Sequence, residues 1–113
     1  MYTVIRKYDL IPGTVEELIQ HVQESLVPII SRVPGFRAYY LLEVGDNEVA
    51  AISIFDTLAD ARTSARQTAA WVAEHTELFF QGFSKPMAGQ VRIQCEPARL
   101  SPTSEEELLQ GSF

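Results

Sequence analysis

The alternation of apolar and polar residues predicts a strand at the start of the chain. Residues 2–9 are rich in β-branched and aromatic side chains, and they stop just before the turn signal Pro12-Gly13. Neither face of this segment is cleanly apolar, because Arg6 shares its face with Val4 and Tyr8. Arg6 is therefore either a cation that points into a pocket or one that faces solvent near an edge.

A helical period begins at Thr14. Thr14 and Glu17 have the spacing of a capping box, in which the threonine hydroxyl accepts a hydrogen bond from the amide of Glu17. Apolar residues then recur every three or four positions as far as Val33, and Pro34-Gly35 ends the run. These features predict an amphipathic helix.

Pro28 interrupts this helix. It has no amide hydrogen to donate, and its ring clashes with the preceding turn. We expect the helix to kink or restart around Leu26 and Val27 and to open a gap above the sheet.

A hairpin follows. Residues 36–43 alternate in polarity, residues 49–55 are the most β-prone segment of the chain, and Gly45-Asp46-Asn47 supplies the left-handed backbone of a short reversal. Both faces of the second strand are apolar. It is therefore expected to be central in the sheet and covered on both sides.

A second helix is expected from Asp56 or Thr57, either of which can cap it, to Gly82. Its inner stripe is made mostly of small side chains: Leu58, Ala61, Ala65, Thr68, Ala69, Val72, Thr76 and Phe79. Small residues let a helix lie close to a sheet, or they leave room for a ligand. The sequence leaves both possibilities open.

A last strand is predicted over Gln90–Cys95, where one face is apolar. The resulting order, βαββαβ, predicts an α+β fold of ferredoxin-like type, with a four-stranded antiparallel sheet and both helices on one face. The domain would span residues 1–95. Residues 96–113 form an acidic tail, in which a capping box at Ser104–Glu107 suggests a short helix ending near Leu109.

The face of this sheet away from the helices would be apolar over several strands. It is formed by Tyr39, Leu41, Val49, Ala51 and Phe55, or by their alternates along the strands. A contiguous apolar patch on a small protein usually marks an interface. We therefore expect a homodimer, joined through the open sheet faces into a closed α+β barrel.

Length and charge exclude several classes of protein. A chain of 113 residues with 46% apolar content has room for one domain. The formal net charge is −6, and half of it comes from residues 96–113. No basic patch is present to bind a phosphate backbone, so nucleic acid is not an expected partner.

The single cysteine, Cys95, has no partner for an internal disulfide, and no Cys/His cluster suggests a metal centre. On the apolar face of its strand, Cys95 is expected to be a small core residue. The start of the chain lacks a signal-peptide pattern, and no apolar run reaches bilayer length. These features predict a cytoplasmic protein without membrane contact.

The only tryptophan, Trp71, and one of two histidines, His75, are four residues apart on the second helix. This spacing stacks both rings on one helix face, above neighbours that are mostly alanine. The two rings either line a cavity or form a packed helix edge. Both interpretations remain open.

Several segments together resemble the antibiotic biosynthesis monooxygenase (ABM) superfamily of dimeric α+β barrels, in particular its short members. The resemblance spans residues 2 to about 95. It is carried by Tyr2–Tyr8, Val27-Pro28-Ile29-Ile30, Pro34-Gly35-Phe36-Arg37-Ala38-Tyr39-Tyr40, Ser53-Ile54-Phe55-Asp56 and Ala70-Trp71-Val72-Ala73-Glu74-His75.

This resemblance implies oxygen insertion into a small phenolic substrate, without metal or flavin cofactor, in a pocket between the sheet and the helices. The implied catalytic residues are Trp71, as a pocket wall, and His75, as a proton carrier. The implied substrate-binding residues are Arg6, Tyr8, Tyr40 and Arg92. The alternative is a non-catalytic dimeric barrel that binds a small ligand or acts in a stress response.

Haem degradation fits the sequence less well. Haem-degrading members of the superfamily resemble this chain in having a tryptophan and a histidine on the second helix. They also use an asparagine on the first strand, and residues 2–9 contain none.

Overall fold

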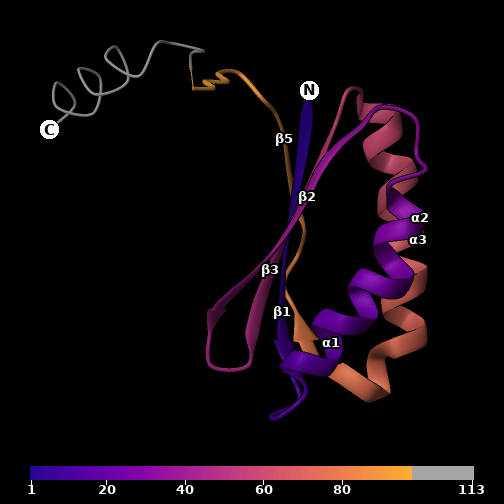
Figure 1. Ribbon diagram of the computed structural model, residues 1–113, viewed down its shortest axis with the longest axis vertical. Helices are drawn as coiled ribbons and strands as arrows, with labels where there is room; N and C mark the ends of the chain where they lie inside the picture. The colour runs from indigo at the N-terminus through magenta and orange to yellow at the C-terminus, as the bar shows by residue number, and fades with distance from the viewer. Residues whose placement is uncertain (98–113) are drawn as a thin grey trace, which may run out of the picture.

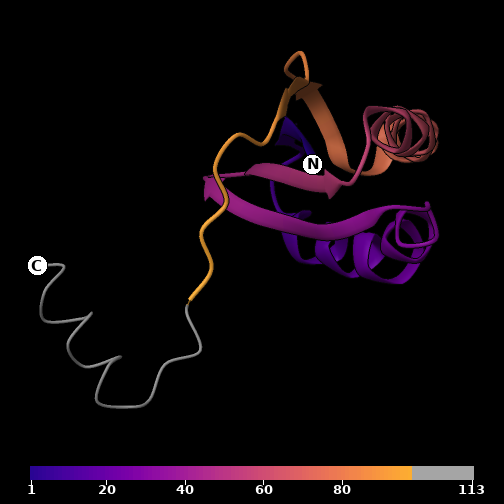
Figure 2. The same cartoon turned by 90° about the horizontal axis from the view of Figure 1, so that it is seen from above.

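Helices cover one face of an antiparallel sheet and leave the other face open (Figures 1 and 2). The computed structural model describes residues 1–97. The helix predicted in the tail, from Ser104 to near Leu109, lies outside the described residues. So does most of the predicted acidic tail.

The sheet is built around its first strand. Strand β1 (Tyr2–Leu10) pairs on one side with β3 (Glu48–Phe55), which in turn pairs with the edge strand β2 (Phe36–Gly45). On its other side β1 pairs with two short strands, β4 (Phe80–Phe83) and β5 (Met87–Gln90). The predicted ferredoxin-like α+β class is confirmed, and the fourth position of the sheet is divided between two strands.

The last strand lies earlier than predicted. The sequence placed it at Gln90–Cys95, whereas β5 ends at Gln90, which pairs with Tyr2 at the start of β1. Only Met1 precedes β1, and its carbonyl accepts a hydrogen bond from the amide of Val91 at 2.8 Å. The prediction that Cys95 is a core residue is also wrong, because Cys95 is exposed.

Pro28 interrupts the first helical segment, as predicted. An α-helix, α1 (Val15–His21), widens into a π-helical turn, η1 (Val22–Leu26), and α2 (Val27–Ile30) continues from it. Proline has no amide hydrogen to donate to the helical ladder, and the turn that widens is the one that precedes Pro28.

The predicted capping box does not form. The hydroxyl of Thr14 donates to the carbonyl of Ile11 at 2.7 Å, and α1 has no side-chain cap. Thr14 has φ −105° and ψ 0°, so it continues the turn after Pro12-Gly13 and is not in the extended conformation that a capping residue usually has.

Helix α3 (Leu58–Phe79) begins as predicted and ends earlier. The hydroxyl of Thr57 accepts from the amide of Asp60 at 3.1 Å, which confirms the predicted cap. The helix ends at Phe79, three residues before Gly82, because Phe80 is extended and pairs with Leu10 in β4.

The strand register determines which way Arg6 points. Arg6 lies opposite Ala51, and Tyr8 lies opposite Val49. Cross-strand partners share a face, and both Tyr8 and Val49 belong to the core under the helices. Arg6 therefore lies on the helix-covered side of a central strand, which excludes the alternative that it faces solvent at an edge.

The opposite face of the sheet carries exposed apolar side chains. Tyr40 is 56% exposed, Leu42 42% and Met87 66%. Strand β3 is central in the sheet, as predicted. Its residues Ile52 and Ile54, which lie opposite Tyr40 and Ala38, are only partly buried within one chain.

Gly35 allows the tight turn between α2 and β2. Its φ is +78°, and a Cβ at this position would overlap the carboxylate of Asp60. We expect Gly35→Ala to lower the free energy of unfolding by about 1–3 kcal/mol, since left-handed backbone strains a residue with a side chain. Urea unfolding measures this. Gly89→Ala is the control, because a Cβ there meets open space. An equal loss for both variants would contradict this account of Gly35.

Candidate functional site

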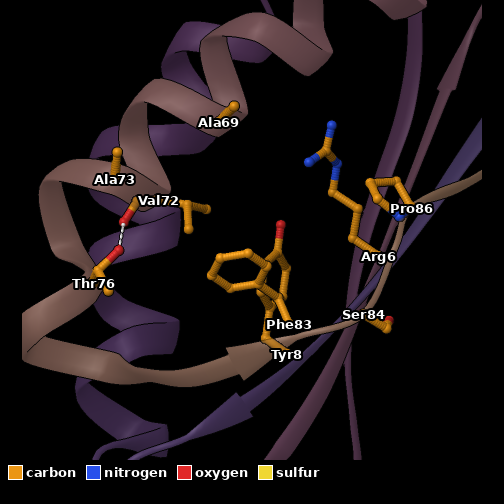
Figure 3. Close-up of a pocket in the computed structure, with 9 residues that line it drawn as sticks. All are labelled: Arg6, Tyr8, Ala69, Val72, Ala73, Thr76, Phe83, Ser84 and Pro86. Atoms are coloured by element: carbon orange, nitrogen blue, oxygen red, sulfur yellow. Dashed lines mark hydrogen bonds between the residues drawn. The ribbon is translucent and has the colours of Figure 1, made fainter.

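A cavity of about 280 Å³ lies between β1 and α3 (Figure 3). Its floor comes from β1 and one wall from α3. The remaining wall is formed by β4 and by the segment that connects β4 to β5. The residues that line it are Arg6, Tyr8, Ala69, Val72, Ala73, Thr76, Phe83, Ser84 and Pro86.

The alanines of α3 make room for this cavity. Ala69 and Ala73 lie one turn apart on the helix, and both line the cavity. The hydroxyl of Thr76 donates to the carbonyl of Val72 at 2.7 Å, so its hydrogen bond is satisfied within the helix. The small residues of the second helix could either let it lie close to the sheet or leave room for a ligand. At Ala69 and Ala73 they leave room.

Tyr8 brings a buried phenol to the cavity. Tyr8 is 8% exposed, and its hydroxyl has no hydrogen-bond partner within residues 1–97. The ring packs against Phe80, with the centroids 5.1 Å apart, and its oxygen points into the space beside Arg6 (Figure 3). A buried polar group without a partner is uncommon in proteins, which makes this hydroxyl a candidate contact for a ligand.

Arg6 is the only charged residue that lines the described cavity. No carboxylate within residues 1–97 forms an ion pair with it. Burial raises the pKa of Tyr8, and the positive charge of Arg6 opposes part of that rise. The phenol is therefore a proton donor across the neutral range.

Tyr39 on β2 is electrostatically coupled to this pair. Burial raises its pKa well above the usual range; the neighbouring Tyr8 adds to the rise, and Arg6 opposes it. Tyr39 packs at the margin of the core and does not line the cavity.

These two phenols predict a loss of stability in alkali. A raised pKa means that the folded state holds the proton more tightly than the unfolded chain does. Stability is therefore complete below the ordinary tyrosine pKa of about 10 and falls as the pH rises above it. We expect Tyr39→Phe to lose less stability than wild type between about pH 9 and pH 11, as measured by urea unfolding. Tyr2→Phe is the control, because Tyr2 is only partly buried and lies outside the open face of the sheet. Equal alkaline losses in Tyr39→Phe and wild type would contradict the prediction.

Trp71 faces the first helical segment and does not line the cavity. It is 4% exposed, and its indole nitrogen donates to the hydroxyl of Ser25 in η1 at 2.8 Å. Ser25 in turn donates to the carbonyl of His21 at 2.7 Å. Trp71 thus ties α3 to the π-helical turn.

His75 stacks on Trp71, as the four-residue spacing predicted. The ring centroids are 4.0 Å apart with an interplanar angle of 20°, and Nδ1 of His75 lies 2.7 Å from the carbonyl oxygen of Trp71. The ring of His21 lies 5.9 Å away. Trp71 and His75 therefore form a packed edge of the helix and do not line the cavity. Their catalytic role stays a prediction.

The remaining predicted site residues lie apart from Arg6 and Tyr8. Tyr40 is on the open face of the sheet, and Arg92 is exposed beyond β5. Sequence reasoning did not identify Phe83, Ser84 and Pro86 as lining residues. Pro86 could have indicated this part of the lining, because a proline there marks the connection between β4 and β5.

Within residues 1–97, no three His, Cys, Asp or Glu side chains gather as a metal site would require. None of the helices in this range is long and apolar enough to cross a membrane.

The part of the chain that matches a known family model contains most of the residues that line the cavity. The model of the family described as antibiotic biosynthesis monooxygenase matches residues 1–76. The chain belongs to the ABM family. The match includes β1 and nearly all of α3, and hence Arg6, Tyr8 and the helical wall of the cavity.

Solved structures share this ABM fold. A protein of unknown function from Nitrosomonas europaea has a TM-score of 0.72 at 16% identity, over 86% of this chain and 94% of that one. A Streptomyces coelicolor monooxygenase, in complex with the ligand nanaomycin D, has a TM-score of 0.69 at 16% identity, over 86% and 92%. An Agrobacterium tumefaciens protein has a TM-score of 0.56 at 24% identity, over 90% and 98%. No curated protein matches the chain.

Proposed function

We propose that the chain is a monooxygenase that needs no bound cofactor and acts on a small phenolic substrate in the cavity between β1 and α3. One observation carries this proposal. The buried hydroxyl of Tyr8 has no partner and lies beside the cation Arg6, in a cavity that is otherwise mainly apolar. Membership of the ABM family and the likeness to a monooxygenase fold support it.

The proposed chemistry suits these residues. An ionised phenol is electron-rich enough to pass an electron to oxygen, and the substrate supplies both hydrogens. The ring C–H carbon para to the phenolic oxygen becomes a carbonyl carbon: one oxygen atom of O2 enters the product, and the other leaves as water with the hydrogen of that carbon and the proton of the phenol. Arg6 and Tyr8 stabilise the phenolate, and the buried side chain of Val72 gives the cavity an apolar wall.

Oxygen consumption tests the activity. Hydroxyanthrones and naphthols are incubated with the wild-type protein, and an oxygen electrode and quinone absorbance follow the reaction. We expect uptake with at least one phenol and a marked loss in Arg6→Leu. Tight binding of these phenols without any uptake would contradict the monooxygenase and favour the alternative, a non-catalytic barrel that binds a small ligand.

We also propose that two copies pair through the open sheet face. The exposed side chains of Tyr40, Leu42 and Met87, with the half-buried Ile52 and Ile54, make this face apolar across three strands. Sedimentation at micromolar concentration is expected to give a dimer, and Ile52→Lys a folded monomer. A monomeric wild-type protein would contradict the pairing.

A further inference from the structure

Two histidines meet outside the cavity, where the first helical segment meets α3. His21 is the last residue of α1, and His75 lies one turn before the end of α3. Their ring centroids are 5.9 Å apart, with an interplanar angle of 66°. Imidazole is the commonest side-chain ligand of metal ions in proteins, so the pair is a candidate site for such an ion.

His75 is held in the tautomer that a metal ion requires. Its Nδ1 lies 2.7 Å from the carbonyl oxygen of Trp71. A carbonyl only accepts hydrogen bonds, so Nδ1 carries the proton and the neutral ring keeps its lone pair on Nε2. Metal-binding histidines usually donate their other N–H group to a carbonyl or carboxylate in this way.

Nε2 of His75 is open to solvent. Within residues 1–97, the buried side-chain atoms without a hydrogen-bond partner are the Tyr8 hydroxyl and Oε1 of Gln67. His75 Nε2 forms no hydrogen bond to the same residues, and it is not one of those buried atoms. A hydrated ion can therefore reach it. The side chain of His21 is exposed as well.

Hydrogen bonds through Trp71 tie the two histidines into one framework. Its indole nitrogen donates to the hydroxyl of Ser25 at 2.8 Å, and that hydroxyl donates to the carbonyl of His21 at 2.7 Å. The ring of His75 stacks on Trp71 and lies nearly parallel to Phe79, with an interplanar angle of 14°. Ligands that are already ordered lose little conformational entropy when an ion binds.

The separation of the two rings suits a single shared ion. A metal ion lies about 2.1 Å from a histidine nitrogen, and hence about 3.2 Å from the ring centroid. Two imidazoles on one ion therefore hold their centroids roughly 4.5–6.4 Å apart, as the angle at the metal opens from about 90° to about 180°. The observed 5.9 Å falls in this range. Because His21 is exposed, its ring can turn to direct a nitrogen at the ion.

We propose that His21 and His75 together bind one divalent late transition-metal ion, such as Ni²⁺ or Zn²⁺, between α1 and α3. Imidazole nitrogens suit these ions, whereas Mg²⁺ and Ca²⁺ take oxygen ligands. A structural metal centre takes four protein ligands and a catalytic one three, and no third His, Cys, Asp or Glu joins this pair within residues 1–97. Water therefore completes the coordination shell, and the ion is exchangeable. It links the two helices and does not touch the cavity.

Thermal unfolding of the untagged protein in NiCl2 or ZnCl2 tests the site. An ion that binds the folded state raises the unfolding midpoint as its concentration rises. At ten times the dissociation constant, which calorimetry measures, we expect a rise of about 5 °C and one ion per chain. MgCl2 is expected to give no rise. An unchanged midpoint with both transition metals would overturn the proposal.

Variants assign the binding to its ligands. His21→Gln and His75→Gln are each expected to bind Ni²⁺ at least about tenfold more weakly, and circular dichroism checks that each is folded. Cys95→Ser is the matched control, because the exposed thiol of Cys95 can also bind these ions. It is expected to keep the affinity of the wild type. Affinity that survives in both folded histidine variants, or that is lost in Cys95→Ser, would contradict the assignment.

Copper identifies the bound atoms without altering either histidine. Cu²⁺ is added to Cys95→Ser, which has no thiol for copper to oxidise, and pulsed electron paramagnetic resonance counts the imidazoles on the ion. Two are expected, and one or none would contradict the shared site. Both outcomes are independent of the oxygen assay, because neither histidine lines the cavity.

Discussion

Replacing Ala73 with phenylalanine is expected to abolish measurable ligand binding while the fold is kept. Ala73 is exposed to the cavity and not packed in the core, so the new ring can occupy the open space without displacing core side chains. We expect 4-nitrophenol to bind at least about 100-fold more weakly, since the ring would remove most of its contact surface. Absorbance titration measures the loss.

The matched control is Ala70→Phe. Ala70 is also exposed on α3, but it does not line the cavity. The affinity of the Ala70→Phe variant for 4-nitrophenol and its thermal unfolding midpoint are expected to stay near those of the wild type. If both phenylalanines weaken binding alike, the ligand site is elsewhere or the helix as a whole has shifted.

Trp71→Ala is expected to lower the free energy of unfolding by about 3–5 kcal/mol, the usual cost of truncating a large buried aromatic residue. Trp71 is 4% exposed, bonds to Ser25 of η1 and stacks on His75. The loss therefore falls on the contact between α3 and the first helical segment. Urea unfolding measures it.

The milder changes Trp71→Phe and His75→Ala separate stability from ligand contact. Both residues lie outside the cavity lining, so both folded variants are expected to bind 4-nitrophenol with an affinity near wild type. A folded His75→Ala that loses oxygen uptake but not binding would support the proton-carrying role predicted from the sequence. Loss of probe binding in either folded variant would show that the cavity lining is wrongly assigned.

Local signals predicted the parts of the fold that they control. The hairpin turn depends on a left-handed residue, and Asn47 has φ 57°. The start of α3 depends on a short polar cap, and Thr57 provides it. Pro28 interrupts its helix because a missing amide hydrogen acts within one turn. In each case the cause and the effect are neighbours in the sequence.

Long-range pairing explains what the sequence could not show. Gln90–Cys95 has a strand-like pattern, but β1 provides no further strand residues for it to pair with beyond Tyr2. The orientation of Arg6 depends on its register against Ala51, which no pattern within residues 2–9 reveals.

Only part of the candidate site could be predicted, because local patterns do not reveal which distant residues meet in the fold. The resemblance to the ABM superfamily points to Arg6 and Tyr8, the helical period points to the small residues of α3, and the structure brings them together. Trp71 and His75 stack as their spacing requires, but helical spacing alone does not say which neighbour they face. They face η1 and α1, where Ser25 and His21 lie.

A crystal structure of the protein with 4-nitrophenol would locate the ligand site itself. We expect the phenolate oxygen within hydrogen-bond distance of both Tyr8 Oη and the Arg6 guanidinium, with the ring between Ala73 and Phe83. A ligand seated against Trp71 and His75, or on the open face beside Tyr40, would contradict it.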